Sequence, residues 1–396
     1  MDAARLADAR NDRAQALALM RAFAQRTGLE GDAPPRRYLW TDAFAVCNFL
    51  ALDEHAAAAR LVAQVHDVLG AHRPDDPRQG PLSGLVGEAA RRHPTQGGLR
   101  IGKPLPERAP DAPYEPALEW ERDGQYFHYL TRWMHALDQY ARHAGAPDAN
   151  RWARELARTA VRAFVSAGDD GAPRMAWKMG IALDRPLVAG MGQHDPLDGL
   201  VTCLQLRAHT PPASGGPTLA PELRTLAALL SGTSLRSDDP LAIGGLLADA
   251  YRLAQLLDER PGDDALLGLL LAAAAAGLAG WLCDHPLARP PAQRLAFREL
   301  GLAIGLLAAA RLWRLLEHAP VAAPVRHSLD QVIAQVPLAR RISRHWLAVA
   351  LDPSPEWCAH EDINAVMLAT CLVPEGWLDF ADGTAAPPRA ASVQPG

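Results

Sequence analysis

The sequence predicts an all-α protein in which two sets of helices form an inner and an outer ring. Apolar residues recur at helical spacing in about twelve segments of the 396-residue chain. Segments that are small or apolar nearly all round alternate with segments that carry a charged face, and each kind occurs about six times. Because a helix that is apolar on every side has to be buried, the first kind is expected inside the second.

The two kinds of helix alternate along the whole chain. The inner helices are expected to begin near residues 41, 125, 197, 240, 294 and 361. LAIGGLLADAY and LGLAIGLLAAA are typical of them, since glycine and alanine let neighbouring helices approach closely. The outer helices, such as ANRWARELARTAVRAF, are expected to begin near residues 4, 55, 150, 219, 264 and 326. In chain order the predicted helices cover residues 4–26, 41–53, 55–70, 125–144, 150–167, 197–208, 219–231, 240–258, 264–283, 294–318, 326–350 and 361–373.

Two stretches interrupt the helical pattern. Residues 71–122 are rich in glycine, proline and arginine, and their LRIGK and Trp120 segments favour a long ordered loop that covers the helices. Residues 173–193, PRMAWKMGIALDRPLVAGMGQ, predict a short β-hairpin insertion. One domain is expected over residues 1–380, followed by a flexible tail, 381–396, rich in alanine, proline and glycine.

Composition points to a cytoplasmic protein with a small-molecule partner. The net charge is −5 and no basic cluster occurs, so nucleic acid is not an expected partner. The apolar run LLGLLLAAAAAGLAGWLC is rich in alanine and glycine and ends at Asp284, which favours a buried helix over a membrane span. The N-terminus is charged and amphipathic rather than a secretory signal, and five irregularly placed cysteines indicate a reducing compartment. The arginine-rich, lysine-poor composition is typical of GC-rich bacterial coding.

The alternating helices and the position of the long loop resemble the six-hairpin, (α/α)6-barrel superfamily. The resemblance covers nearly the whole chain and concerns the fold, since no diagnostic motif is matched. That superfamily includes many glycoside hydrolases and the N-acylglucosamine 2-epimerase group, and more distantly the lanthionine and terpenoid cyclases. It implies that the inner helices run parallel, with their N-termini at one mouth. A superhelical solenoid of helix pairs is the structural alternative, although no fixed-period repeat supports it.

The helix predicted at 125–144 carries a polar face where a surface helix would carry only charges. His128, Thr131, His135 and Asp138 recur at helical spacing beside the aromatic Trp133. This pattern suits a helix that lines a polar cavity. The plainer interpretation is a partly exposed helix whose histidines are solvated or hydrogen-bonded locally.

Polar clusters stand at or just before the start of every predicted inner helix. In the resembled barrel these clusters would converge on one crater, with His135 and Asp138 on its floor. The clusters are Tyr38, Trp40 and Asp42; Asp123, Gln125 and His128; Gln193, His194, Asp195 and Asp198; Ser237, Asp238 and Asp239; Arg298 and Glu299; and His360, Glu361, Asp362 and Asn364.

Helix capping is the competing explanation for many of these acids. Asp195 precedes Pro196 and Asp239 precedes Pro240, which is the usual order of a cap followed by proline at the first helical position. Capping does not require the neighbouring histidines, amides and tryptophans. Their density is what indicates a site.

Three segments outside the helices are candidates for ligand contact. In GMGQHDPLDGL, two glycines allow close approach of the backbone, and Gln193, His194, Asp195 and Asp198 follow them. The hairpin would bring Trp177 and Lys178 to the same rim, where an indole can stack on a sugar. Residues 89–103, ARRHPTQGGLRIGK with His93, Arg100 and Lys103, could bind phosphate or carboxylate but match no P-loop.

The leading functional hypothesis is a carbohydrate-active enzyme, a glycoside hydrolase-like protein that uses paired carboxylates in a central crater. One carboxylic acid would protonate the departing oxygen while a second activates water or attacks the sugar. Asp123 and Asp195 are the predicted pair, with Asp42, Glu299 and Glu361 in reserve. The predicted substrate-binding residues are Trp40, Asp42, Gln125, His135, Trp177, Lys178, Gln193, Asp198, Glu299, Glu361 and Asn364.

Three alternatives remain open at this point. A sugar epimerase or isomerase would use His128, His194 and His360 as acid and base. No cofactor is expected, but a metal enzyme could use the Cys-x-His pairs Cys283/His285 and Cys358/His360, as the resembled lanthionine cyclases do, or His194 and Asp195 with His360, Glu361 and Asp362. A non-catalytic binding protein on the same fold is the third alternative.

Overall fold

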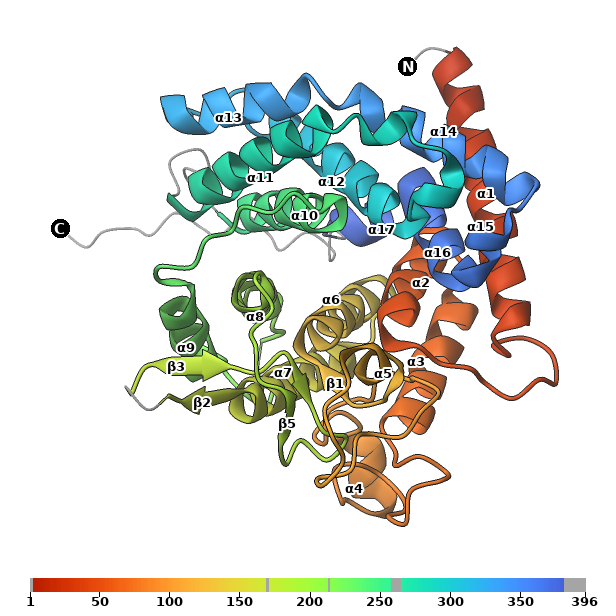
Figure 1. Cartoon of the computed structure of the whole chain (residues 1–396), viewed down its shortest axis with the longest axis vertical. Helices are drawn as coiled ribbons and strands as arrows, with labels where there is room; N and C mark the ends of the chain where they lie inside the picture. Colours follow the sequence, from red (N-terminus) through yellow and green to blue (C-terminus); the bar gives the residue numbers. More distant parts are fainter. Residues whose placement is uncertain (1–2, 169–170, 213, 258–264, 381–396) are drawn as a thin grey trace.

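The computed structural model of the chain is predominantly helical, with small antiparallel sheets (Figure 1). It describes residues 3–168, 171–212, 214–257 and 265–380, and the predicted tail 381–396 lies outside these ranges. The long helices are α1 (Ala3–Arg26), α2 (Leu39–Ala51), α3 (His55–Leu69), α6 (Phe127–His143), α7 (Pro147–Phe164), α8 (Asp195–Ala208), α9 (Ala220–Leu230), α10 (Pro240–Leu256), α11 (Ala265–Cys283), α12 (Ala296–Leu315), α13 (Ala323–Ile333), α14 (Pro337–Leu351) and α16 (Glu361–Leu372).

Helices occur in all the predicted segments, and one segment differs in form. The prediction of a single helix over 326–350 is wrong. The structure has two helices there, α13 and α14, separated by a turn at residues 334–336. Pro337 stands in the first turn of α14, where its missing N–H costs nothing, whereas inside a continuous helix it would break a hydrogen bond. The chain also contains short helices, α4 (Gly87–Arg92), α5 (Pro116–Glu121), α15 (Pro355–Ala359) and α17 (Glu375–Leu378), and the 3₁₀ turns η2 (Pro286–Ala288) and η3 (Pro291–Gln293).

The six helices predicted to be inner pack against one another in chain order. α2 contacts α6, α6 contacts α8, α8 contacts α10, α10 contacts α12, α12 contacts α16, and α16 contacts α2. Figure 1 shows these helices following one another around the centre of the view. The other long helices pack against these or against one another: α3 on α2, α7 on α6, α9 on α8, α11 on α10, α13 on α11, α14 on α12, and α1 on α16.

Glycine allows α10 and α12 to pack with their backbones in contact. A Cβ atom at Gly244 would overlap the carbonyl of Gly301, and one at Gly305 would lie 2.5 Å from the Cα of Gly244. The glycines lower the intrinsic helix propensity, so tertiary packing has to compensate for them. This is the close approach that the small residues of LAIGGLLADAY and LGLAIGLLAAA predict.

The hairpin predicted over 173–193 is divided between two sheets. β4 (Lys178–Met179) and β5 (Pro186–Val188) pair as predicted, and β1 (Gln125–Tyr126) adds to β4, with Gln125 opposite Met179. The start of the segment, β3 (Pro173–Met175), instead pairs with β2 (Val165–Ala167) at the end of α7. The three-stranded sheet fixes the chain just before α6.

The long loop at 71–122 is ordered, as predicted, because its backbone bonds to the helices that it covers. The Arg100 amide donates to the Leu69 carbonyl at 2.9 Å, and the Ile101 amide donates to the Gly124 carbonyl at 2.8 Å. Leu99 and Ile101 are fully buried. This segment therefore lies between the end of α3 and the strand that precedes α6.

One helix among the described residues, α11, is long and apolar enough to cross a membrane by length and composition. It packs against α10 and α13, and 44% of its most apolar window is buried inside the protein. A core helix of a globular protein makes the same contacts.

Candidate functional site

A cavity of about 570 Å³ lies among the six inner helices and is called the inner cavity here. Each of these helices contributes to its wall, together with α17 and the loop at 188–194. Its polar lining residues are His128, Arg132, Gln193, His194, Asp195, Asp198, Asp239, Asp249, Arg252 and Arg298. The larger part of the lining is apolar, as in most small-molecule sites.

A second cavity of about 1150 Å³, the outer cavity, adjoins the first. Trp40, His128, Trp177, Leu241 and Arg298 line both, so the two cavities share a wall. The outer cavity is bounded by the first turns of α2, α12 and α16, the end of α1, and residues 100–104 of the long loop. Each of the six predicted polar clusters contributes at least one residue to one of these adjoining cavities, but other members of the clusters line neither.

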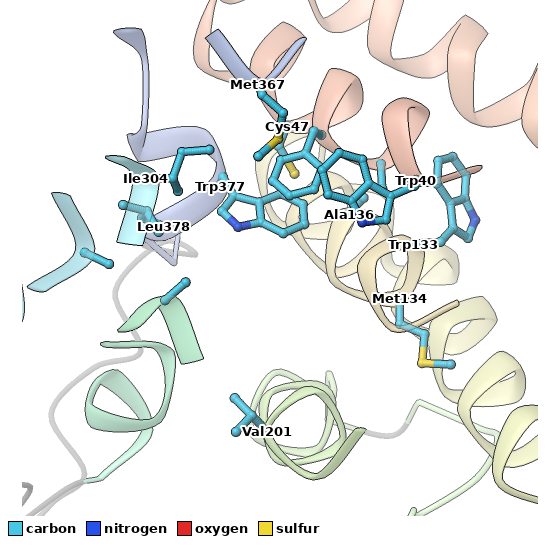
Figure 2. Close-up of a cluster of buried hydrophobic side chains, with 14 of the residues drawn as sticks. Trp40, Cys47, Trp133, Met134, Ala136, Val201, Ile304, Met367, Trp377 and Leu378 are labelled. Atoms are coloured by element: carbon cyan, nitrogen blue, oxygen red, sulfur yellow. The ribbon is translucent and has the colours of Figure 1, made fainter. Parts of the chain in front are cut away.

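Aromatic rings form one wall of the inner cavity. The Trp40 and Phe44 rings have centroids 4.6 Å apart, and Phe44 stacks on Trp377 with centroids 3.7 Å apart and planes 17° apart. Figure 2 shows Trp40 and Trp377 in this cluster, with Ile304 and Met367 beside Trp377. Flat apolar surfaces of this kind suit the apolar face of a sugar or an aromatic ring.

Asp195 and His128 face each other in the inner cavity without hydrogen-bond partners. Asp195 Oδ1 lies 3.6 Å from His128 Nδ1, and neither that nitrogen nor Asp195 Oδ2 has a hydrogen-bond partner among the described residues. Burial, and then repulsion from Asp198, raises the pKa of Asp195 to about 8. Burial, and then the nearby Arg132 charge, lowers the pKa of His128 to about 3. At neutral pH the pair is therefore a carboxylic acid beside a neutral imidazole.

The local sequence explains why Asp195 is free. It is the first residue of α8, but His194 is the N-cap and Asp195 accepts no capping hydrogen bond. A Cβ atom at Gly192 would lie 2.5 Å from the Asp195 carboxylate, so glycine is needed where the backbone passes this group. The capping explanation applies instead to Asp239, which accepts from the amides of Leu241 at 2.9 Å and Ala242 at 3.1 Å.

Two further acidic residues, Asp198 and Asp249, line the inner cavity, and each pairs with an arginine. Asp198 and Asp249 interact electrostatically, and Asp249 Oδ2 is buried without a hydrogen-bond partner among the described residues. Arg132 Nη2 lies 3.0 Å from Asp198 Oδ2, and Arg252 Nη1 lies 2.8 Å from Asp249 Oδ1. Burial, and then the Asp198 charge, raises the pKa of Asp249. Asp198 is also close enough to Asp195 for its charge to raise the pKa of Asp195.

Three predicted site residues are used to hold loops and do not line either cavity. Asp123 is fully buried and bonds Arg100 Nη1 at 2.6 Å and the Gly102 amide at 3.0 Å. Gln125 bonds the Leu99 amide at 2.8 Å, among other backbone groups. Lys178 bonds the Glu119 carboxylate at 2.9 Å and two backbone carbonyls. Their hydrogen bonds are satisfied inside the protein, so we leave all three out of the proposed site.

Three more predicted residues are buried outside the cavities. Glu299 makes a two-point ion pair with Arg294, at 2.7 and 2.5 Å, and accepts from the Trp346 indole. Asn364 accepts from the Phe297 amide at 3.1 Å. His135, expected on the crater floor with Asp138, bonds the Trp377 carbonyl at 2.9 Å. These three side chains are therefore not part of the proposed site, because they stabilise contacts between helices.

The remaining predicted residues divide between the two cavities. Gln193 and His194 line the inner cavity, but Gln193 donates to two backbone carbonyls and His194 Nε2 donates to the Leu235 carbonyl at 2.7 Å. Asp42, His360 and Glu361 line only the outer cavity. The three histidines of the epimerase hypothesis therefore do not meet at one point. The predicted residues that line the inner cavity are Trp40, His128, Trp177, Gln193, His194, Asp195 and Asp198, together with Asp239 and Arg298 of the predicted polar clusters.

The predicted metal ligands do not assemble. Within the described ranges, no group of three or more His, Cys, Asp or Glu side chains is placed to hold a metal ion. Cys283 and Cys358 are exposed and unpaired.

Four important lining residues were not predicted: Arg132, Asp249, Arg252 and Trp377. Asp249 and Arg252 interrupt α10, which is otherwise almost wholly apolar, and both are buried. A charged pair three residues apart inside such an apolar helix could have been recognised in the sequence as a candidate for the site. Nothing in the sequence indicated that Trp377 lines the cavity, because its position depends on the turn that carries α17 back against α2.

A scan against protein-family models, a search of curated proteins and a search of solved structures each found no match to the chain.

Proposed function

We propose that the chain is an (α/α)6 barrel whose inner cavity is an active site. Contacts between successive inner helices, and between α16 and α2, support this fold. Residues in the first turns of the inner helices line the cavities, which supports a common mouth. Fold alone does not determine which reaction an enzyme catalyses, and the side chains that line the cavity do.

The proposed function is that of a carbohydrate-active enzyme, a glycoside hydrolase-like protein acting on a small sugar or oligosaccharide. The observation that carries it is the Asp195 carboxyl group, whose raised pKa keeps it protonated, beside the Asp198 and Asp249 side chains in an aromatic-walled cavity. Asp195 would protonate the departing oxygen, and the pair would activate water or attack the sugar. Trp40, Phe44 and Trp377 would bind the sugar face.

A sugar epimerase or isomerase is the second candidate, because His128 and Asp195 form an acid–base couple by themselves. In such a couple Asp195 would donate a proton to the substrate and neutral His128 would accept one from it, and His128 Nδ1 has no hydrogen-bond partner within the described chain. Such an enzyme would exchange a substrate proton with solvent without cleaving a glycosidic bond. Incubation of candidate sugars in deuterated water, followed by mass spectrometry, separates the two reactions.

The test is the turnover of aryl glycosides and small oligosaccharides by Asp195→Asn. Loss of the acid is expected to lower kcat by at least ~100-fold, since general acid catalysis contributes on that order. The melting temperature should not fall, because Asp195 Oδ2 has no partner to lose. Glu88→Gln, at an exposed carboxylate, is the matched control. Unchanged turnover in Asp195→Asn on every substrate that the wild type cleaves would refute the proposal.

A further inference from the structure

The outer cavity contains positively charged groups that the proposed chemistry does not use. Lys103 and Arg37 line this cavity from two chain segments that touch each other. The Leu39 amide bonds the Ile101 carbonyl at 3.0 Å. Gly102, with φ +93°, passes so close to the Arg37 carbonyl that a Cβ atom would overlap it. The loop at 100–104 is thereby held against the start of α2.

Arg37 is a buried cation with unused hydrogen-bond donors. Its side chain is 0% exposed, and its Nε and Nη1 atoms have no hydrogen-bond partner among the described residues. Nη2 donates to the Thr27 carbonyl at 2.6 Å, and Asp42 Oδ1 lies 3.5 Å from Nη1. A guanidinium group presents five N–H donors, and leaving some of them buried without an acceptor is costly. An acceptor entering the cavity would remove that cost.

Lys103 adds a more accessible charge to the same wall. Its ammonium group lies 5.5 Å from the centre of the Tyr38 ring, and no carboxylate in the described part of the chain forms an ion pair with it. It is one of only two lysines in the sequence, and the other, Lys178, is fully used inside the protein. Lys103 is therefore the cation in this wall that is free to meet a ligand.

The carboxylates around the outer cavity are mostly engaged. Asp42 accepts from the Tyr38 amide at 2.9 Å, in addition to its contact with Arg37. Glu361 and Asp362 each lie 3.0 Å from Arg26. Arg100 and Arg298 pair with Asp123 and Asp239, and Arg36 pairs with Asp362. Lys103 is left without an ion pair among the described residues, and Arg37, although paired with Asp42, keeps two nitrogens without a hydrogen-bond partner. Glu121 also lines the cavity and is exposed.

The helix starts around the cavity favour the same sign of ligand. Residues in the first turns of α2, α12 and α16 line it, and each of these helices is at least 12 residues long. The N-terminus of a helix carries a partial positive charge and attracts anions. Together with the unpartnered nitrogens of Arg37, these helix starts make the cavity a place for a negatively charged group.

We propose that the outer cavity is an anion-binding subsite, in which Lys103 and Arg37 hold a carboxylate, sulfate or phosphate group of the substrate. This inference rests on the proposed function and narrows it: the sugar processed in the inner cavity is acidic. The two cavities share Trp40, His128 and Trp177, so one ligand can occupy both, with its acidic group toward Lys103 and its reacting bond toward Asp195.

Titration calorimetry on the full chain tests the subsite directly. The probes are glucuronate and galacturonate for a sugar carboxylate, inorganic phosphate and sulfate for the other two groups, and glucose as the neutral reference. The best anion should bind at least about tenfold tighter than glucose, and Lys103→Met should weaken its binding about tenfold, the effect of one charge-assisted hydrogen bond. Arg224→Gln, at an exposed arginine of α9, should leave the Kd unchanged.

Arg37→Lys gives a second variant that keeps the charge opposite Asp42. It removes the unpartnered nitrogens, so it should also weaken the anion about tenfold if the guanidinium group is used. Anion binding no tighter than that of glucose, or equal in Lys103→Met, Arg37→Lys and Arg224→Gln, overturns the subsite.

The subsite and the enzymatic proposal can fail separately. If turnover of acidic glycosides requires Asp195 but does not respond to Lys103→Met, the hydrolase survives and the subsite is wrong. If anion binding requires Lys103 but no turnover depends on Asp195, the subsite survives and the hydrolase is wrong.

Discussion

Asp195 should make the stability of the protein fall as the pH rises. Burial first, and Asp198 second, raises its folded-state pKa to about 8, whereas an unfolded Asp has a pKa near ~3.9. Between these values the folded state holds a proton that the unfolded state has lost. The stability from this group is therefore complete below the unfolded pKa and is lost as the pH rises through about 8.

Urea unfolding at pH 5 and pH 9 measures this effect. Asp195→Asn removes the titrating group, so its free energy of unfolding should decrease between the two pH values by at least ~1 kcal/mol less than that of the wild type. Glu88→Gln, at an exposed carboxylate, should follow the wild type. Equal pH dependence in Asp195→Asn and the wild type would mean that Asp195 is ionised in the folded state.

Residue type and position in the sequence predicted where the site lies, at the starts of certain helices, better than they predicted which residues line it. Asp195, Asp198 and His128 line the inner cavity, as their place at the starts of α8 and α6 suggests. Asp123 occupies an equivalent place and is nevertheless structural, because Arg100 reaches it from a loop 23 residues earlier. Only the folded path of that loop tells a satisfied carboxylate from a free one. Asp249 was missed although a lone acid in an apolar helix could have indicated it.

At the scale of elements, the contact between α10 and α12 should tolerate no side chain at Gly244. A methyl group there would overlap the Gly301 carbonyl, which is backbone and cannot rotate away. We expect Gly244→Ala to lower the free energy of unfolding by ~1–3 kcal/mol, the usual cost of overpacking. Chemical denaturation of the purified variant measures it.

Gly245 provides the matched control for Gly244. It is the next residue of the same helix, and the nearest atom to a Cβ placed there is Arg132 Nη2 at 3.8 Å. Gly245→Ala should therefore be neutral or stabilise the protein by roughly 0.5–1 kcal/mol through helix propensity. If the two variants had the same stability, the close backbone contact between α10 and α12 would be wrong.

Sequence periodicity predicted the helices well, because apolar residues recur at helical spacing within each of them, including α6 with its polar face. It failed where a local feature decides the element. The turn before Pro337 divides one predicted helix into two, and the strand pairing of Met175 with Val165 draws β3 away from the predicted hairpin. A pairing partner outside the segment cannot be read from the segment itself.

At the scale of the whole molecule, one buried side chain near the start of the chain, Asn48, makes hydrogen bonds to a helix near its end. Asn48 on α2 donates to the Val366 carbonyl of α16 at 3.0 Å and accepts from the Thr370 hydroxyl at 2.9 Å. On the exposed side, Arg26 of α1 pairs with Glu361 and Asp362. Helices more than 300 residues apart in sequence thus form one packed unit, which periodicity alone cannot show.

Asn48→Ala tests whether the chain unfolds as one unit. The substitution removes two buried hydrogen bonds between α2 and α16, so the free energy of unfolding should fall by ~1–3 kcal/mol. Because the first and last inner helices pack together, tryptophan fluorescence and far-ultraviolet circular dichroism should still report a single transition, shifted to lower denaturant. Thr370→Ser keeps the hydroxyl and should shift it less. Separate transitions already in the wild type would show that α16 opens independently, and the closed ring of inner helices would then have to be abandoned.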